Sequence, residues 1–149
     1  MYNDKYFMDI ALSLAKKAFN ENEIPVGALI VINNEIIAQA YNQKDASRLV
    51  TKHAELIAIE QASNKVGDWR LNDATIYVTM EPCPMCASAI QQSRIRRLVY
   101  GCSSNITDNT EIICHILQNN NYNHQVLVSK GILDDECSSI VKEFFRSRR

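Results

Sequence analysis

The stretch His53-Ala54-Glu55, together with Pro82-Cys83-Pro84-Met85-Cys86 further along the chain, supplies one imidazole, one carboxylate and two thiols. Cys83 and Cys86 are three residues apart where proline favours a helix start, so their sulfurs should share one face. The positive end of a helix favours thiolates, the form that binds metal. Two thiolates and one imidazole leave the fourth position of a tetrahedral zinc ion open, as in catalytic sites. These two stretches therefore predict a zinc centre around which the rest of the chain is organised.

Glu55 is expected to act as a proton shuttle rather than as a ligand. Residues two apart on a helix point to nearly opposite sides, so His53 and Glu55 serve one pocket only if it lies off the first helical turn. The site is therefore predicted where the helix that starts near His53 meets the helix that starts near Cys83. Zinc lowers the pKa of its water to about 7, which suits hydrolytic attack on an amidine-like carbon with loss of ammonia.

The ordered combination of the two motifs is more specific than either motif alone. A lone Cys-x-x-Cys also occurs in redox pairs and in structural zinc sites. The order His-x-Glu…Pro-Cys-x-x-Cys is the known signature of zinc-dependent nucleobase deaminases. A closed structural site would need a fourth protein ligand, and the spare candidates lack ligand-like spacing: His115, His124, Cys102, Cys114 and Cys137.

Composition indicates one folded domain spanning residues 1–149. Of the 149 residues 46% are hydrophobic, with only 3 Pro and 4 Gly, which is enough for a single good core. The formal net charge of -1 gives no global attraction for nucleic acid, so any basic surface must be local. Five cysteines without a secretion signal indicate a reducing cytoplasm. No apolar run approaches the roughly 20 residues that a membrane helix needs, so no membrane partner is expected.

Hydrophobic periodicity predicts alternating helices and strands. Helical spacing of apolar residues predicts helices over 4–21, 53–63, 82–93, 111–117 and 134–149. Apolar runs rich in β-branched residues predict strands over 26–32, 35–41, 74–80, 97–101 and 125–129. Asn33-Asn34 should form a tight hairpin because Asn tolerates positive φ, and the polar segment 42–51 is expected to be a loop.

This order of elements predicts an α/β fold. Continuous rather than alternating apolarity in 26–32 indicates a sheet that is covered on both faces. We therefore expect a three-layer α/β/α sandwich with a mixed five-stranded sheet and helices on both faces. Asp4 and Thr51 are expected to cap the first two helices, and Gly67 lies just beyond the end of the second.

Several further stretches carry a resemblance to a known family. From about Asp9 to Arg149 the chain resembles the bacterial tRNA-specific adenosine deaminases of the cytidine deaminase-like superfamily. The matching stretches are Ile24-Pro25-Val26-Gly27-Ala28, the run from Asp73 to Cys83, Ser93-Arg94-Ile95, Gly131-Ile132-Leu133 and Phe144-Phe145-Arg146. The resemblance implies a cytidine deaminase-like fold.

The resemblance also implies an activity, a cofactor and partners. The activity is hydrolysis of the wobble adenosine of a tRNA anticodon to inosine, in a cytoplasmic homodimer whose two subunits both touch the RNA. One Zn²⁺ per subunit would be bound by His53, Cys83 and Cys86, with Glu55 as the proton shuttle. Asn42, eleven residues before His53, would contact the flipped nucleoside.

Two segments bear on how the anticodon stem-loop is bound. At the C-terminus, Phe145 is placed to stack on an RNA base. Arg146 belongs to a cluster of cations that suits phosphate binding; alternatively, these cations only balance the negative end of the last helix. The cluster comprises Lys142, Arg146, Arg148 and Arg149, with Arg94, Arg96 and Arg97 as an extension. The stretch Cys102 to Asn109 departs from the family because it has no Lys and no Gly.

Two alternative functions use the same residues. A deaminase of a free nucleoside or base, of cytidine or guanine type, would share the zinc chemistry, and only the C-terminal tail and the overall resemblance oppose it. A non-catalytic zinc-stabilised RNA-binding module would have no need of a carboxylate beside an open zinc position. Glu55 therefore distinguishes the enzyme from the binding module.

Overall fold

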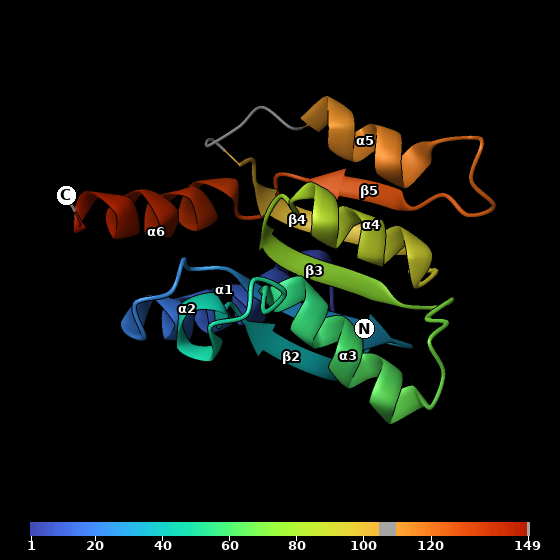
Figure 1. Ribbon diagram of the computed structural model, residues 1–149, viewed down its shortest axis with the longest axis horizontal. Helices are drawn as coiled ribbons and strands as arrows, with labels where there is room; N and C mark the ends of the chain where they lie inside the picture. The colour runs from blue at the N-terminus through green and yellow to red at the C-terminus, as the bar shows by residue number, and fades with distance from the viewer. Residues whose placement is uncertain (105–109, 149) are drawn as a thin grey trace.

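A five-stranded sheet in the order β2-β1-β3-β4-β5 forms the centre of the protein (Figure 1). The structure is a computed structural model and describes residues 1–104 and 110–148. The strands are β1 (Gly27–Ile32), β2 (Glu35–Tyr41), β3 (Thr75–Met80), β4 (Arg97–Cys102) and β5 (Leu127–Lys130). The helices are α1 (Asp4–Asn20), α2 (Lys44–Ser47), α3 (Ala54–Val66), α4 (Pro84–Gln92), α5 (Thr110–Gln118) and α6 (Asp134–Arg146).

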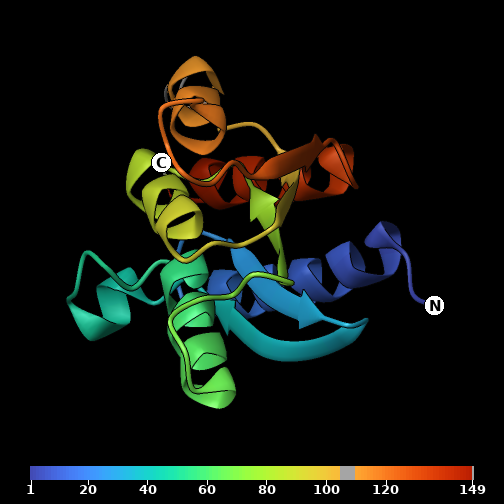
Figure 2. The ribbon, with the colours of Figure 1, turned by 90° about the vertical axis from the view of Figure 1, so that its right-hand side faces the viewer.

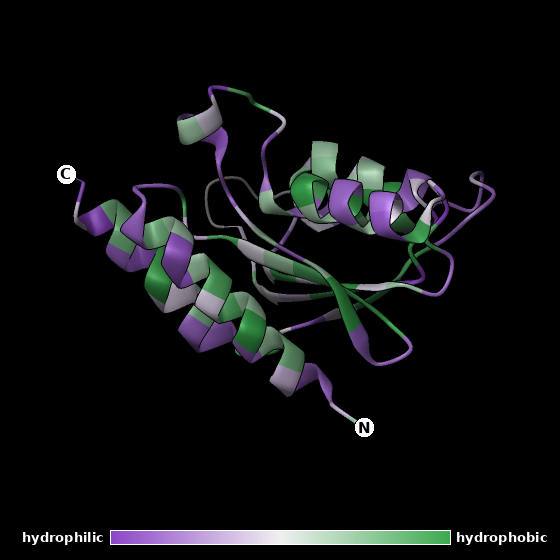
Figure 3. Ribbon diagram, turned by 90° about the horizontal axis from the view of Figure 1, so that it is seen from below, coloured by the Kyte–Doolittle hydropathy of each residue, from purple (hydrophilic) through white to green (hydrophobic). Residues whose placement is uncertain are grey.

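Helices cover both faces of this sheet, which confirms the predicted fold class. Figures 2 and 3 show α1 and α6 on one face and α3, α4 and α5 on the other. Two hydrophobic clusters fill the spaces between the layers, one on each face of the sheet. The inner strands β1, β3 and β4 are buried along almost their whole length, as their continuous apolarity predicts.

The sheet is mixed, and its parallel half positions the functional residues. β1 pairs antiparallel with β2 and β3, whereas β3, β4 and β5 run parallel. The hairpin between β1 and β2 turns at Asn33 and Asn34, with φ of 51° and 63°, as predicted. In a parallel sheet the carboxyl ends of neighbouring strands meet at one edge, where ligands usually bind. α4 starts at that edge, directly after β3.

Close packing of α1 on the sheet depends on Gly27. A Cβ atom at this position would collide with the carbonyl oxygen of Ala11 and would lie 2.7 Å from the backbone nitrogen of Ala15. Both are backbone atoms, so no side chain can rotate away to make room. Glycine therefore allows the helix to rest directly on β1.

Several predicted boundaries and caps differ from the structure. Asn3, not Asp4, caps α1 by accepting a hydrogen bond from the Tyr6 backbone nitrogen at 3.0 Å. Thr51 is not the cap of α3, because His53 occupies that position. The predicted loop 42–51 contains the short helix α2. Gly67 ends α3 in the left-handed conformation with φ of 80°, as its position beyond the helix indicated.

The described part of the chain has no helix long and apolar enough to cross a membrane.

Candidate active site

Two helix starts bring the three predicted zinc ligands together. His53 is the N-cap residue of α3, and Cys83 is the N-cap residue of α4, with Cys86 in the first turn of α4. The His53 Nδ1 atom lies 3.7 Å from Cys83 Sγ and 3.5 Å from Cys86 Sγ. All three ligand atoms lie within 4.8 Å of one another. The three side chains thus converge where these two helices begin, as the spacing of the motifs predicts.

The geometry of this group fits zinc. With bond lengths of 2.3 Å to sulfur and about 2.05 Å to nitrogen, tetrahedral zinc separates an S and an N ligand by about 3.6 Å. The observed separations of 3.7 Å and 3.5 Å agree with this value. In residues 1–104 and 110–148, this is the one group of three or more potential ligands close enough to hold a metal. Three ligands leave a position for a reactant, as in catalytic sites.

The acidities of the ligands also suit a metal. The pKa of Cys83 is lowered to about 4, chiefly because the Cys86 thiol hydrogen-bonds to it, while burial opposes the shift. The pKa of Cys86 is raised because that thiol keeps the proton it shares with Cys83 and is buried. The pKa of His53 is raised, first by its hydrogen bond with Cys83. A zinc ion would displace the shared proton and hold both sulfurs as thiolates.

Glu55 lies in the first turn of α3 and is 4% exposed. Its pKa is raised to about 7, chiefly because burial penalises the charged carboxylate, with the Cys83 thiolate adding to the effect. A carboxyl group with this pKa exchanges protons at neutral pH, which is what a general acid–base group requires.

A cavity of ≈ 250 Å³ opens over these residues. It is smaller than the about 300–1,000 Å³ of pockets that take drug-sized ligands, so it suits one base better than a large molecule. Its polar wall includes Asn42, which is buried, and Lys44. Its apolar wall includes Ile24, Val26 and Met80. The structure thus places Asn42 in the same cavity as Glu55 and the zinc ligands.

Glu23 does not line the cavity, but it binds the helix that contributes Lys44 to the cavity wall. Its side chain is 1% exposed and accepts hydrogen bonds from the backbone nitrogens of Asp45 at 3.0 Å and Ala46 at 2.7 Å. These bonds hold the start of α2, the helix that carries Lys44 into the cavity wall. A glutamate ahead of an apolar strand carries no motif, so only the tertiary contact reveals this role.

Glu81 lines the cavity itself, and no sequence motif marked it as a site residue. Its Oε2 atom accepts hydrogen bonds from the hydroxyl groups of Tyr100 at 3.1 Å and Thr110 at 3.0 Å. Its Oε1 atom is buried and has no hydrogen-bond partner among residues 1–104 and 110–148. Ser104 also lines the cavity, whereas 105–109, the rest of the atypical stretch, lie outside the described residues.

Comparisons with known proteins agree with this site. Residues 1–102 match the family model of the cytidine and deoxycytidylate deaminase zinc-binding region. A tRNA-specific adenosine deaminase of Bacillus subtilis is 41% identical over 149 residues, which cover 100% of this chain and 92% of the relative. The chain belongs to the tRNA-specific adenosine deaminase family. The resemblance inferred from its motifs is thereby confirmed, and zinc is the cofactor of this deaminase.

Further relatives agree with the family, and a more distant one agrees with the fold. A tRNA-specific adenosine deaminase of Haemophilus influenzae is 41% identical over 98% of this chain and 85% of the relative. A structure from a study of A-to-I editing by tRNA:A34 deaminases has a TM-score of 0.83 and 36% identity, covering 91% of this chain and 98% of that one. A guanine deaminase from Nitrosomonas europaea has a TM-score of 0.79 over 97% of this chain and 85% of that one, but at 22% identity it shows the shared fold alone.

The C-terminal residues of the deaminase lie apart from the cavity over the zinc ligands. Phe144 is buried, as predicted, whereas Phe145 is 37% exposed and Arg146 is exposed, and neither lines the cavity over the zinc ligands. Arg148 packs over the Phe144 ring at 3.8 Å and donates a hydrogen bond to Asn22 Oδ1 at 2.6 Å. Arg149 lies outside the described residues.

Arg97 does not extend the cationic cluster. Its guanidinium donates to both carboxylate oxygens of Asp4, at 2.9 Å and 2.7 Å, and also to Ser129 Oγ at 2.9 Å. The Arg97 partner holds the pKa of the Asp4 carboxyl below its ordinary value. This pair explains why Asp4 does not cap α1, because its oxygens already bind Arg97 and Tyr77.

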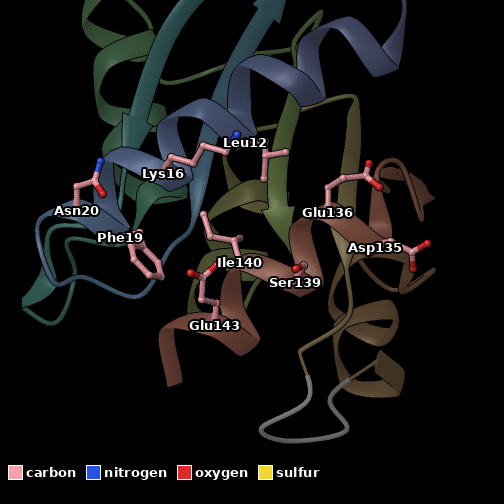
Figure 4. Close-up of a pocket in the computed structure, with 9 residues that line it drawn as sticks. All are labelled: Leu12, Lys16, Phe19, Asn20, Asp135, Glu136, Ser139, Ile140 and Glu143. Carbon is pink, nitrogen blue, oxygen red and sulfur yellow. The ribbon is translucent and has the colours of Figure 1, made fainter. Parts of the chain in front are cut away.

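A larger cavity of ≈ 660 Å³ lies elsewhere, between α1 and α6 (Figure 4). Leu12 and Lys16 of α1 face Ile140 and Glu143 of α6 across it. It contains none of the zinc ligands and neither Glu55 nor Asn42. The candidate site residues Asn42, Glu55 and Cys83 line the smaller cavity instead, so cavity size alone does not locate them.

Proposed function

We propose that residues 1–149 form one zinc-dependent deaminase domain that hydrolyses the wobble adenosine of tRNA anticodons to inosine. The observation that carries the chemistry is the buried Glu55, with a pKa of about 7, beside a three-ligand zinc group in a base-sized cavity. The substrate follows from the relatives, which are tRNA-specific adenosine deaminases 41% identical over nearly the whole chain.

In this proposal Glu55 moves the proton that deamination requires. Zinc held by His53, Cys83 and Cys86 supplies Lewis acidity that makes water nucleophilic at neutral pH. Glu55 accepts a proton from the water that attacks C6 of adenine and delivers it to the departing amino group, which leaves as ammonia. Burial raises the pKa of this carboxyl to about 7 in the metal-free chain, which marks Glu55 as a group that can both accept and release a proton near neutral pH.

Asn42 is proposed to hold the flipped nucleoside. Its amide offers both donors and an acceptor, so it can bind a ribose hydroxyl or a base edge. It is buried in the cavity wall, and its backbone nitrogen donates to Val26 O at 3.1 Å, which fixes its position relative to β1. Lys44 in the same wall supplies a cation for the adjacent phosphate.

RNA outside the cavity is proposed to contact Phe145 and Arg146. Both are exposed at the end of α6, where an aromatic ring can stack on a base and a guanidinium can bind phosphate. The partner is the anticodon stem-loop of tRNA, and the enzyme acts as a cytoplasmic homodimer, as the family resemblance implies. Bases in a single-stranded loop are cheap to flip, which suits this substrate.

The test is nucleoside analysis after incubation of the zinc-loaded protein with an anticodon stem-loop that has adenosine at the wobble position. Parallel reactions contain free adenosine, cytidine or guanine, and a stem-loop with guanosine at the wobble position. Inosine from the adenosine stem-loop alone is expected. Turnover restricted to a free base or nucleoside would replace this function with that of a nucleoside or base deaminase, and no turnover on any substrate would favour a binding module.

A further inference from the structure

A third cavity, an open cleft, lies at the opposite end of α4 from the zinc ligands. It has a volume of ≈ 460 Å³ and combines aromatic, amide and cationic side chains. Its lining includes Trp69, Gln91, Gln92, Arg94, Tyr122 and His124. Nothing in the chemistry proposed above uses this cleft.

Trp69 gives the cleft an aromatic surface that faces solvent. It is 52% exposed and is the single tryptophan of the chain. The guanidinium of Arg70 lies 4.6 Å from the ring centroid and that of Arg94 lies 5.9 Å away. Exposed aromatic rings flanked by arginine are the usual platform on which single-stranded bases stack. Tyr122, also exposed, adds a second ring to the same cleft.

Arg94 is the cation available to a ligand. Arg70 is occupied, since its Nη1 atom lies 3.4 Å from Asp68 Oδ1. Arg94 has no ion pair within residues 1–104 and 110–148. It also has a φ of 64°, a left-handed conformation that glycine or asparagine adopts more readily. Arg94 therefore places a cation, without an ion pair among the described residues, beside an aromatic ring in the lining of the cleft, which is what a phosphate next to a stacked base requires.

Hydrogen bonds fix the part of the lining that Gln91 and His124 contribute. The Gln91 side-chain amide donates a hydrogen bond to His124 O at 3.0 Å, and His124 Nε2 donates to Ile95 O at 2.7 Å. These bonds tie the 119–126 segment to the end of α4. The cleft is therefore shaped before any ligand enters, which lowers the entropic cost of binding.

We propose that this cleft binds one phosphorylated nucleotide of the same RNA whose wobble base enters the zinc cavity, with the base stacked on Trp69 and the phosphate on Arg94. This inference rests on the proposed function. The nine residues of α4 separate the two sites by about 14 Å at 1.5 Å per residue. The two sites thus lie at the two ends of one short helix, and a stem-loop of several nucleotides is long enough to reach both. A free mononucleotide carries the same base and phosphate and is the alternative ligand of this cleft.

Trp69 fluorescence tests the proposal directly, because no other tryptophan contributes to the signal. The zinc-loaded protein is titrated with the anticodon stem-loop, with AMP and with adenosine. We expect the stem-loop to quench Trp69 at the concentrations that support inosine formation, AMP to quench only at far higher concentrations, and adenosine, which lacks phosphate, least of all.

Arg94→Asn removes the phosphate contact and suits the left-handed backbone, so the variant should fold. Its stem-loop Kd should rise about tenfold, and the slope of log K against log salt should fall by about 0.7, the value for one phosphate on a single strand. Lys5→Ala removes the same charge from α1, on the other face of the sheet, and should change neither quantity.

The outcomes separate this inference from the proposed function. Absence of inosine with the wild-type protein refutes the proposed function. Inosine formation with unchanged Trp69 fluorescence, or an unchanged Kd in Arg94→Asn, refutes the nucleotide cleft alone. If AMP quenches Trp69 at a lower concentration than the stem-loop does, the ligand of the cleft is a free mononucleotide and not RNA. Trp69 fluorescence that depends on protein concentration without RNA would show that a second copy of the chain covers the cleft, and would overturn the proposal.

Discussion

Glu55→Gln should separate the catalytic role of Glu55 from its effect on stability. The substitution keeps the shape of a side chain that is 4% exposed and removes its ability to carry a proton. Loss of a positioned acid–base group typically slows a reaction by about 10²–10⁴-fold, which is roughly 2.7–5.5 kcal/mol in the barrier. Bound zinc should remain at one per chain, because Glu55 lies outside the three-ligand group.

The same substitution should stabilise the metal-free protein in a pH-dependent way. The pKa of the Glu55 carboxyl is raised from 4.5 to about 7 on folding, so the folded chain binds the proton more tightly than the unfolded chain. Ionisation of Glu55 therefore opposes folding, and its cost grows as the pH rises from 4.5 towards 7. At about 1.4 kcal/mol per pKa unit, the cost is about 3 kcal/mol at pH 8 and below about 1 kcal/mol at pH 5. Glutamine has no such cost.

Urea denaturation of both metal-free proteins under reducing conditions, at pH 5 and pH 8, measures this difference. The stability of Glu55→Gln relative to wild type should increase by about 2–3 kcal/mol between the two pH values, whatever constant cost the buried amide adds. Glu60→Gln is the matched control, because it lies on the same helix with an exposed side chain and should show no such increase. A relative stability that is the same at pH 5 and pH 8 would refute the reasoning that burial raises this pKa.

Three further perturbations test the site and its support. Cys86→Ser should reduce bound zinc, measured by metal analysis, and abolish turnover at any substrate concentration, because only two of the three ligands remain. Glu23→Ala should raise KM for the stem-loop and lower the unfolding free energy by about 1–3 kcal/mol, because it leaves two backbone N–H groups at α2 without an acceptor; zinc content should not change. Glu23→Gln keeps an acceptor oxygen and should lower the unfolding free energy less. An equal loss of unfolding free energy in both variants would contradict this argument. Gly27→Ala should lower the unfolding free energy by about 1–3 kcal/mol or more, because the new Cβ collides with α1. Gly67→Ala should lower it less, because Gly67 has open space around it and only its positive φ opposes a side chain. A larger loss for Gly67→Ala in urea titrations would contradict the packing argument.

Features encoded by neighbouring residues could be predicted from the sequence because their causes are local. Asn33-Asn34 takes the positive φ of a hairpin, and Gly67 ends α3 in the left-handed conformation. Cap choice was predicted less well, for a reason that lies outside the local sequence. Asp4 is a good cap by propensity, but Arg97, distant in the chain, binds its carboxylate and leaves Asn3 as the cap.

The sequence by itself determined the chemistry of the active site, because residue types and spacing decide which ligands two helix starts can present. His53, Cys83 and Cys86 could thus be predicted as ligands before any coordinates, and local apolar runs predict the five strands. Only the tertiary structure decided what surrounds them. Glu23 meets α2 across 22 residues of chain, and Trp69 meets Arg94 across a turn, a strand and a helix. Such contacts arise from how the layers pack, and no spacing within one element encodes them.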